Sequence, residues 1–279
     1  MRVMVGSVET LWRYPVKSML GEELEASEIT EHGLLGDRAY ALLDVQSGRV
    51  ASAKNPKKWA KLLEFQAAYT TTPVREAIPS VNVSLPDGRS LTSEAIETSS
   101  ILSGLLGREV QLLSSAPKTA SLDQYWPDVE GTAYQEAITE LVLPPDTFFD
   151  SCFVHALTTA TLAKLQVLYP DGQFEPCRFR PNILIKPVVD EAAFVEDAWV
   201  GSVLAIGDEV RLSIDTACPR CVVTTLAQSG LPTDLDILRT TAQHNNVIAG
   251  IRASVLQSGT IRRNDAIWLE SQSEVVSLT

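Results

Sequence analysis

Two cysteines separated by two residues, in Cys218-Pro219-Arg220-Cys221, are the clearest local candidate for chemistry in this sequence. A pair with this spacing is typical of a thioredoxin-like redox site or of half a zinc ribbon. A ribbon needs a second pair, whereas Cys152 and Cys177 stand alone. A thioredoxin-like site needs a helix that begins at its first cysteine, and the β-branched residues 222–225 predict a strand instead. Burial of the pair as two small hydrophobic side chains remains the simpler interpretation.

Arg220, between the two cysteines, favours a functional interpretation because a guanidinium is rarely buried unless it faces an anion. A soft thiolate is the ligand expected for a high-valent metal surrounded by sulfur. One cysteine beside an anion-binding arginine therefore suits a metal held mostly by its own organic ligand, and a molybdenum–pterin cofactor fits that description. Such a pterin also needs hydrogen-bonding groups for its rings and cationic or hydroxyl groups for its phosphate, which other parts of the chain must supply.

The composition limits the kinds of partner. With 279 residues, of which 45% are hydrophobic, the chain can form one large domain or two ordinary ones. A net charge of −12 argues against nucleic acid, and the basic cluster of Lys54, Lys57 and Lys58 is expected to be a solvated loop. No apolar run is long enough for a membrane span, and no signal peptide is visible, so we expect no membrane partner and a cytoplasmic protein with reduced thiols. The three histidines lack zinc-site spacing and are expected to be surface or packed residues.

The elements that must position these residues are mostly strands. The first hundred residues predict strands over 5–12 and 39–44, with hairpin turns at 46–48 and 86–88. A helix is predicted over 93–106, ending at Gly107, and a strand follows over 110–113. Residues 114–148 are polar and rich in proline, so we predict a long connection with a short helix at 134–141.

The second half continues this pattern. Thr158 is predicted to cap a helix that stops at 170–172, and the segments 202–212 and 259–269 each predict a strand, a tight turn with Asp and another strand. Strands outnumber helices and do not alternate with them. The sequence therefore predicts a β-rich α+β fold of barrel type rather than a doubly wound parallel sheet.

Five motifs give the sequence a family resemblance through their order and spacing, although each is weak alone. They are Tyr14-Pro15-Val16-Lys17-Ser18, Gly36-Asp37-Arg38, Ala53-Lys54-Asn55-Pro56, Phe179-Arg180-Pro181-Asn182, and Cys218-Pro219-Arg220-Cys221 with Thr224-Thr225. In these motifs the chain resembles the MOSC proteins that carry an N-terminal MOSC β-barrel, a family that includes YcbX-like enzymes and the mitochondrial amidoxime-reducing component. The resemblance implies an N-terminal MOSC β-barrel-like domain over 1–115 and a C-terminal MOSC β-barrel domain over 116–279.

The resemblance also implies the site residues. Cys221 would be the molybdenum ligand and a catalytic residue, while the role of Cys218 stays open. Asp190 or Glu191 would place a catalytic acid near the open metal position. Eight further residues would contact the cofactor, namely Lys17, Ser18, Arg38, Asp150, Ser151, Arg180, Asn182 and Arg220.

The implied activity is reduction of small N-hydroxylated or N-oxygenated compounds at the molybdenum cofactor. The sequence ends about ten residues after Trp268 without a further cysteine cluster, so we expect electrons from a separate flavin reductase, ferredoxin or haem carrier. Related MOSC domains are fused to pyridoxal-phosphate-dependent cofactor sulfurases, and because no such domain is visible here we expect a pyridoxal phosphate-independent protein. Two alternatives stay open: a non-catalytic carrier of the cofactor or of sulfur on Cys221, and a metal-free β-barrel scaffold.

Overall fold

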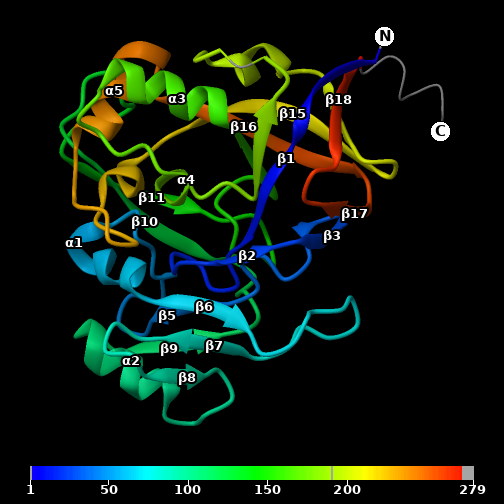
Figure 1. Cartoon of the computed structure of the whole chain (residues 1–279). Coiled ribbons are helices and arrows are strands. Elements are labelled where there is room, and N and C mark those ends of the chain that lie inside the picture. The colour runs from blue at the N-terminus through cyan, green and yellow to red at the C-terminus, as the bar shows by residue number, and fades with distance from the viewer. Residues whose placement is uncertain (1, 190, 272–279) are drawn as a thin grey trace.

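The computed structural model describes residues 2–189 and 191–271, and it is built around one closed barrel. Seven strands form its wall in the order β13-β12-β16-β15-β14-β18-β1, and pairing of β1 with β13 closes it (Figure 1). Their bounds are β1 Val3–Arg13, β12 Val154–Thr158, β13 Ile183–Pro187, β14 Val203–Ile206, β15 Val210–Pro219, β16 Ile248–Gln257 and β18 Ala266–Glu270. The short strand β2, Glu22–Leu24, extends the sheet beside β1. The predicted β-rich barrel fold is thus confirmed.

Alternation of apolar side chains explains why these segments form a barrel. Along β15, Val210, Leu212 and Ile214 are buried at every second position, and along β1 the buried Val8 and Leu11 lie on either side of the bulge between Val8 and Thr10. These side chains join one hydrophobic core inside the barrel. Strands with period-two burial place one face on such a core and the other toward solvent or covering helices.

Helices cover the end and the outside of the barrel. They are α3 Thr159–Leu168, α4 Pro176–Phe179, the 3-10 helices η2 Val195–Trp199 and η3 Val222–Thr225, and α5 Asp236–Asn245. The predicted cap of α3 is confirmed, because Thr158 Oγ1 accepts a hydrogen bond from the Thr161 amide at 3.1 Å. The crossover through α3 allows β12 and β13 to pair in parallel, while the other wall strands pair antiparallel.

A second module with its own core lies below the barrel in Figure 1. Its elements are β5 Ala41–Asp44, α1 Pro56–Trp59, η1 Ala60–Glu64, β6 Gln66–Tyr69, β7 Val81–Ser84, β8 Ser90–Thr92, α2 Thr98–Leu106 and β9 Val110–Leu113. The strands β3 Ala26–Thr30 and β4 Gly33–Leu34 precede it and bury Ile29 and Leu34 in the barrel core. The predicted β7–β8 hairpin is present, and α2 ends at Gly107 with a left-handed backbone as predicted, although it begins five residues later than expected.

The two modules share strands. β1 comes from the first residues of the chain yet is a wall strand of the C-terminal barrel, and β17, Gly259–Arg262, pairs with β3, which also comes from the N-terminal part of the chain. The segment 259–269 therefore contains two strands as predicted, but they pair with different partners. The division at 115/116 remains a prediction, since residues on each side of it contribute to both modules.

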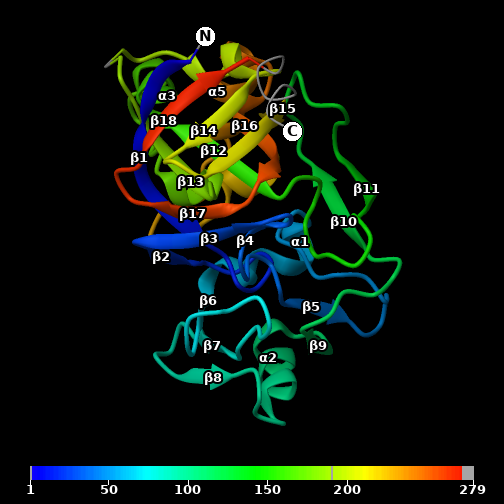
Figure 2. The same ribbon diagram turned by 90° about the vertical axis from the view of Figure 1, so that its right-hand side faces the viewer.

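The predicted helix at 134–141 is wrong. β10, Ser121–Trp126, and β11, Ala137–Val142, form an antiparallel hairpin that stands beside both modules in Figure 2. Exposure alternates along β11, and the Trp126 indole donates to Thr139 Oγ1 at 2.8 Å across the pair. The period-two pattern of residues 137–142 is the signal that the helical interpretation missed.

The predicted strand over 222–225 is also wrong, because these residues form η3. Thr224 and Thr225 donate their side-chain hydroxyls to the carbonyls three residues earlier, at 3.0 and 2.7 Å. Such local hydrogen bonds stabilise a tight turn and override the β preference of branched side chains.

Candidate functional site

A pocket opens between the end of the barrel and the second module, with a cavity volume of about 140 Å³. It brings together Cys221 and all eight predicted cofactor-binding residues: Lys17, Ser18, Arg38, Asp150, Ser151, Arg180, Asn182 and Arg220. Of the two candidates for a catalytic acid, Asp190 lies outside the described residues, and Glu191 is exposed and does not line the pocket. The remaining lining residues are Ser52, Lys54, Phe149, Cys152, His155, Phe179, Cys218, Pro219, Val223 and Arg252.

The backbone of the pocket is strained at three of these residues. Ser18, Arg38 and Arg180 have φ values of 64°, 50° and 55°, in the left-handed region that non-glycine residues rarely adopt. The turns are held by neighbouring main chain, because the Arg38 amide donates to the Tyr14 carbonyl at 2.9 Å and the Lys17 amide donates to the Tyr40 carbonyl at 2.8 Å. Strain of this kind persists where surrounding contacts enforce it, which is common at ligand sites.

Asp37 joins the two modules at the edge of the pocket. Its Oδ1 accepts from the Tyr14 amide at 2.7 Å, and its Oδ2 accepts from Asn182 Nδ2 at 2.9 Å and from the guanidinium of Arg38. Asn182 Oδ1 accepts in turn from the His155 amide at 3.1 Å. The amide group of Asn182 is therefore occupied by protein partners, and its contribution to the pocket is to fix the turns around it.

Tyr14 separates two cations of the pocket. The guanidinium carbons of Arg38 and Arg180 lie 4.6 and 4.2 Å from the centre of its ring, a cation–π geometry. Burial lowers the pKa of Arg180 to about 10, so the group stays charged at neutral pH. Its Nη1 is buried and has no hydrogen-bond partner among residues 2–189 and 191–271. A buried N–H without an acceptor costs free energy, and an anionic ligand in the pocket would supply that acceptor.

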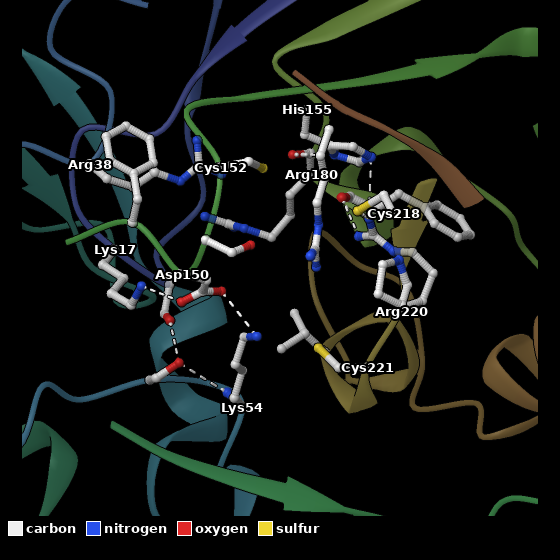
Figure 3. A pocket seen from close by; sticks show the side chains of 18 of the residues that line it. Lys17, Arg38, Lys54, Asp150, Cys152, His155, Arg180, Cys218, Arg220 and Cys221 are labelled. Carbon is white, nitrogen blue, oxygen red and sulfur yellow. Dashed lines mark hydrogen bonds and ion pairs between the residues drawn. The ribbon is translucent and has the colours of Figure 1, made fainter. Parts of the chain in front are cut away.

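Asp150 lies between two lysines. Its Oδ1 is 2.6 Å from Lys17 Nζ and its Oδ2 is 3.2 Å from Lys54 Nζ, as Figure 3 shows. Burial alone would raise the pKa of Asp150, but the charges of Lys17 and Lys54 outweigh it and hold that pKa well below the ordinary value. Lys54 was expected in a solvated loop. That expectation is wrong, because its side chain is 15% exposed and reaches the pocket.

The cysteine loop forms the opposite side. β15 ends at Pro219, and the Arg220 amide then donates to the Val247 carbonyl at 2.7 Å. Arg220 Nη1 donates to Cys218 Sγ at 3.0 Å and Nη2 donates to the Phe179 carbonyl at 2.5 Å, while its Nε is buried without a partner. Burial raises the pKa of Cys218, but the charges of Arg220 and His155 outweigh burial and bring that pKa well below its ordinary value.

Cys221 is half-buried at the start of η3 and faces the pocket on the same side as Lys54 (Figure 3). Its carbonyl accepts from the Thr224 amide at 3.1 Å and from Thr224 Oγ1 at 3.0 Å, which fixes the backbone of the loop. Both cysteines line the pocket, but Cys221 is the more exposed of the two, whereas Cys218 is buried and accepts a hydrogen bond from Arg220.

Charge is concentrated in this pocket. Its lining includes six cationic side chains and a single carboxylate, that of Asp150, in a protein of net charge −12. The cations are Lys17, Arg38, Lys54, Arg180, Arg220 and Arg252. Together with the two unpaired guanidinium N–H groups, this arrangement fits an anionic ligand, and Cys221 adds one soft sulfur donor.

Sequence reasoning missed the contributions of His155 and Arg252. His155 Nε2 lies 3.2 Å from Arg220 Nη1, and Arg252 is directly opposite His155 in the β12–β16 pair. Both residues line the pocket. His155 and Arg252 are close only because two strands almost a hundred residues apart pair with each other. No local pattern in the sequence indicates such a pairing.

Comparison with known proteins identifies the class to which this fold and pocket belong. Residues 146–268 match the MOSC domain, and residues 5–102 match the MOSC N-terminal beta barrel domain. The chain therefore belongs to the MOSC proteins with an N-terminal MOSC barrel domain. Among the described residues, none of the helices is long and apolar enough to cross a membrane.

Among individual proteins, the chain is similar to two mitochondrial amidoxime-reducing components. It is 27% identical to component 2 of Bos taurus over 235 residues, which covers 80% of this chain and 67% of that protein. It is 27% identical to component 1 of Homo sapiens over 242 residues, covering 80% and 66%. The match thus spans about two thirds of the length of these relatives. A solved structure, the YUAD protein from Bacillus subtilis, aligns over 97% of this chain and 98% of its own, with a TM-score of 0.49 and 11% identity.

Proposed function

We propose that this protein is a molybdenum-cofactor-dependent reductase that acts on small N-hydroxylated or N-oxygenated compounds and receives electrons from a separate protein. One observation carries the proposal. Two buried guanidinium N–H groups without protein acceptors, on Arg180 and Arg220, lie in a cationic pocket that also presents the thiol of Cys221. An anionic, sulfur-rich metal cofactor would satisfy all three groups. The family membership and the names of the amidoxime-reducing relatives support the same conclusion.

The residues divide the work of holding the cofactor. Cys221 would bind the metal through its thiolate, and Arg180 and Arg220 would donate to the anionic and pterin parts. Lys17 and Arg38 would neutralise the phosphate with Ser18, and Asp150 with Ser151 would keep Lys17 and Lys54 oriented. Asn182 would act through Asp37 by fixing the turns that carry these groups.

When bound, the cofactor supplies the two-electron reduction in which an N–OH group and two protons become N–H and water. The chain itself provides the binding site, excludes bulk water from the buried side of the pocket and fixes the cationic groups in place before substrate arrives. The two electrons come from an external flavin reductase, ferredoxin or haem carrier in this proposal.

The test compares Cys221→Ser with Cys177→Ser, a half-buried cysteine on α4 outside the pocket lining. Each full-length protein is produced in a host that makes the cofactor, and molybdenum, pterin and turnover of an aromatic amidoxime with reduced dye are measured. We expect the unchanged protein and Cys177→Ser to hold molybdenum and turn over, and Cys221→Ser to fold but lose turnover. Bound cofactor without turnover in the unchanged protein would favour the carrier alternative, and absence of both molybdenum and pterin would contradict reductase and cofactor carrier alike.

A further inference from the structure

Arg178 is a completely buried side chain that does not line the pocket. It lies on the short helix α4, two residues before Arg180. In the part of the chain that the structure describes, its guanidinium forms no ion pair. Burial lowers the pKa of Arg178, with Asp234 partly opposing, although an arginine so placed remains charged at neutral pH. A buried charge of this kind is costly unless it is fully hydrogen-bonded.

Four main-chain carbonyls satisfy this guanidinium. Nε donates to the Gln173 carbonyl at 2.8 Å, and Nη2 donates to the Pro232 carbonyl at 2.8 Å. Nη1 donates to the Thr224 and Leu226 carbonyls at 3.1 and 3.2 Å. Arg178 thus joins α4 to both the end of η3 and the loop that follows it.

Arg178 is connected to Cys221 through Thr224. Thr224 is held at its carbonyl by Arg178, and the same residue donates its amide and its hydroxyl to the Cys221 carbonyl at 3.1 and 3.0 Å. η3 is only four residues long, and a single 3-10 turn has weak hydrogen bonds of its own. Its position therefore depends on the outside anchor.

The other end of the same helix leads to the anion-binding residues. The Arg180 amide donates to the Pro176 carbonyl at 2.9 Å, which closes α4 and starts the left-handed turn at Arg180. The Phe179 carbonyl accepts from Arg220 Nη2 at 2.5 Å. Two arginines consequently fix the turn bearing Arg180 to the turn bearing Cys221: Arg220 through the Phe179 carbonyl, and Arg178 through the carbonyls of Thr224 and Leu226.

We infer that Arg178 is a positioning residue that sets the separation between the Cys221 thiol and the Arg180 guanidinium. The inference deepens the proposed function and rests on it for the identity of the ligand. The chemistry of the side chain explains the choice of residue, because the planar guanidinium offers five N–H donors in a fixed fork. A lysine ammonium has three donors at one point and cannot reach four separate carbonyls.

The test uses the full-length protein with Arg178→Lys and, as a matched control, Arg239→Lys, an exposed arginine of α5 paired with Asp236. The first readout needs no cofactor: alkylation of Cys221 by iodoacetamide, followed by peptide mass spectrometry, with Cys152 in the same pocket as internal reference. We expect Arg178→Lys to raise the Cys221 rate about fivefold relative to Cys152 by loosening η3. Arg239→Lys should leave the ratio unchanged.

The second readout is the electron paramagnetic resonance spectrum of the partly reduced molybdenum protein, which a uniform loss of stability would not shift. A folded Arg178→Lys protein with unchanged Cys221 alkylation and spectrum would overturn the inference. If Arg178→Lys does not fold, Thr224→Val decides, because it removes only the hydroxyl bond to Cys221: a faster Cys221 rate supports the inference and an unchanged rate overturns it. If the unchanged protein holds no molybdenum, the proposed function fails while the alkylation ratio still decides the role of Arg178.

Discussion

Both sides of the pocket are positively charged, but they differ in whether carboxylates of the protein neutralise their cations. On the side of the N-terminal module, Lys17 and Lys54 pair with Asp150, and Arg38 pairs with Asp37. On the barrel side, Arg180 and Arg220 form no ion pair within the described residues, and each has a buried N–H without an acceptor. The first side is complete in the protein alone, whereas the second leaves hydrogen-bonding capacity that only a ligand can use.

Because of this difference, we expect the cations of the first side to contribute to folding stability and those of the second side to contribute to ligand binding. A cation paired with a buried carboxylate contributes to folding, because removing it leaves the partner's charge unpaired. A buried cation without a partner opposes folding and is retained for what it binds. Variants on the two sides should therefore differ in their effect on stability while both weaken the binding of an anionic cofactor.

The largest effect is expected for Arg38→Leu. Asp37 would keep its bonds from Tyr14 and Asn182 but lose the one ion pair that it forms in the described part of the chain, so the free energy of unfolding should fall by about 3 kcal/mol. Urea unfolding at pH 7, monitored by circular dichroism, measures this. A double variant, Arg38→Leu with Asp37→Asn, serves as control and should recover part of the loss. A loss below about 1 kcal/mol in the single variant would show that this side does not depend on pairing.

Arg180→Leu should act mainly on cofactor binding. Because Arg180 forms no ion pair among the described residues and its buried Nη1 lacks an acceptor there, losing its cation–π contact with Tyr14 should change the free energy of unfolding little, while retention of the molybdenum cofactor should fall about tenfold or more. Molybdenum per protein after dialysis, together with the same urea unfolding, measures both changes. A destabilisation as large as that of Arg38→Leu would contradict the proposal that only the cations of the first side stabilise the fold.

Asp150→Asn is expected to have the smallest effect and a dependence on pH. The folded pKa of Asp150 is depressed, so its carboxylate stabilises the protein at pH values above the unfolded value of about 4 and loses this contribution as pH falls through the folded pKa. The side chain is 36% exposed, so solvent screening limits the difference at pH 7 to about 1 kcal/mol. Unfolding curves of the two proteins should converge below pH 4, and a gap that widens on acidification would contradict the assignment.

The sequence predicted the strand-rich barrel from local patterns, and it named nine of the pocket residues through the family resemblance that its motifs carry. Period-two burial marks strands such as β1 and β15, and short motifs mark the turns at Ser18, Arg38 and Arg180. The proposed roles of these residues remain predictions. Their placement in one pocket is what the structure adds.

The errors come from interactions that are not local. The turn at Val222–Thr225 is stabilised by a hydrogen bond from Arg178, which lies on a different helix. Lys54 is largely buried because it forms an ion pair with Asp150, almost a hundred residues away in the sequence. His155 and Arg252 meet only because β12 pairs with β16. Propensities within a short window contain none of these partners.

The place of β1 in the barrel also bears on the order in which the protein can fold during synthesis. β1 is synthesised before its partners β13 and β18, which follow about 170 and 260 residues later, so the barrel closes only when nearly the whole described chain is available. Lys17 and Ser18 lie shortly after β1, and Arg180 lies shortly before β13. The pocket is therefore complete only after β13 and β18 have been synthesised, and slow closure of the barrel sets the earliest time at which a cofactor can bind.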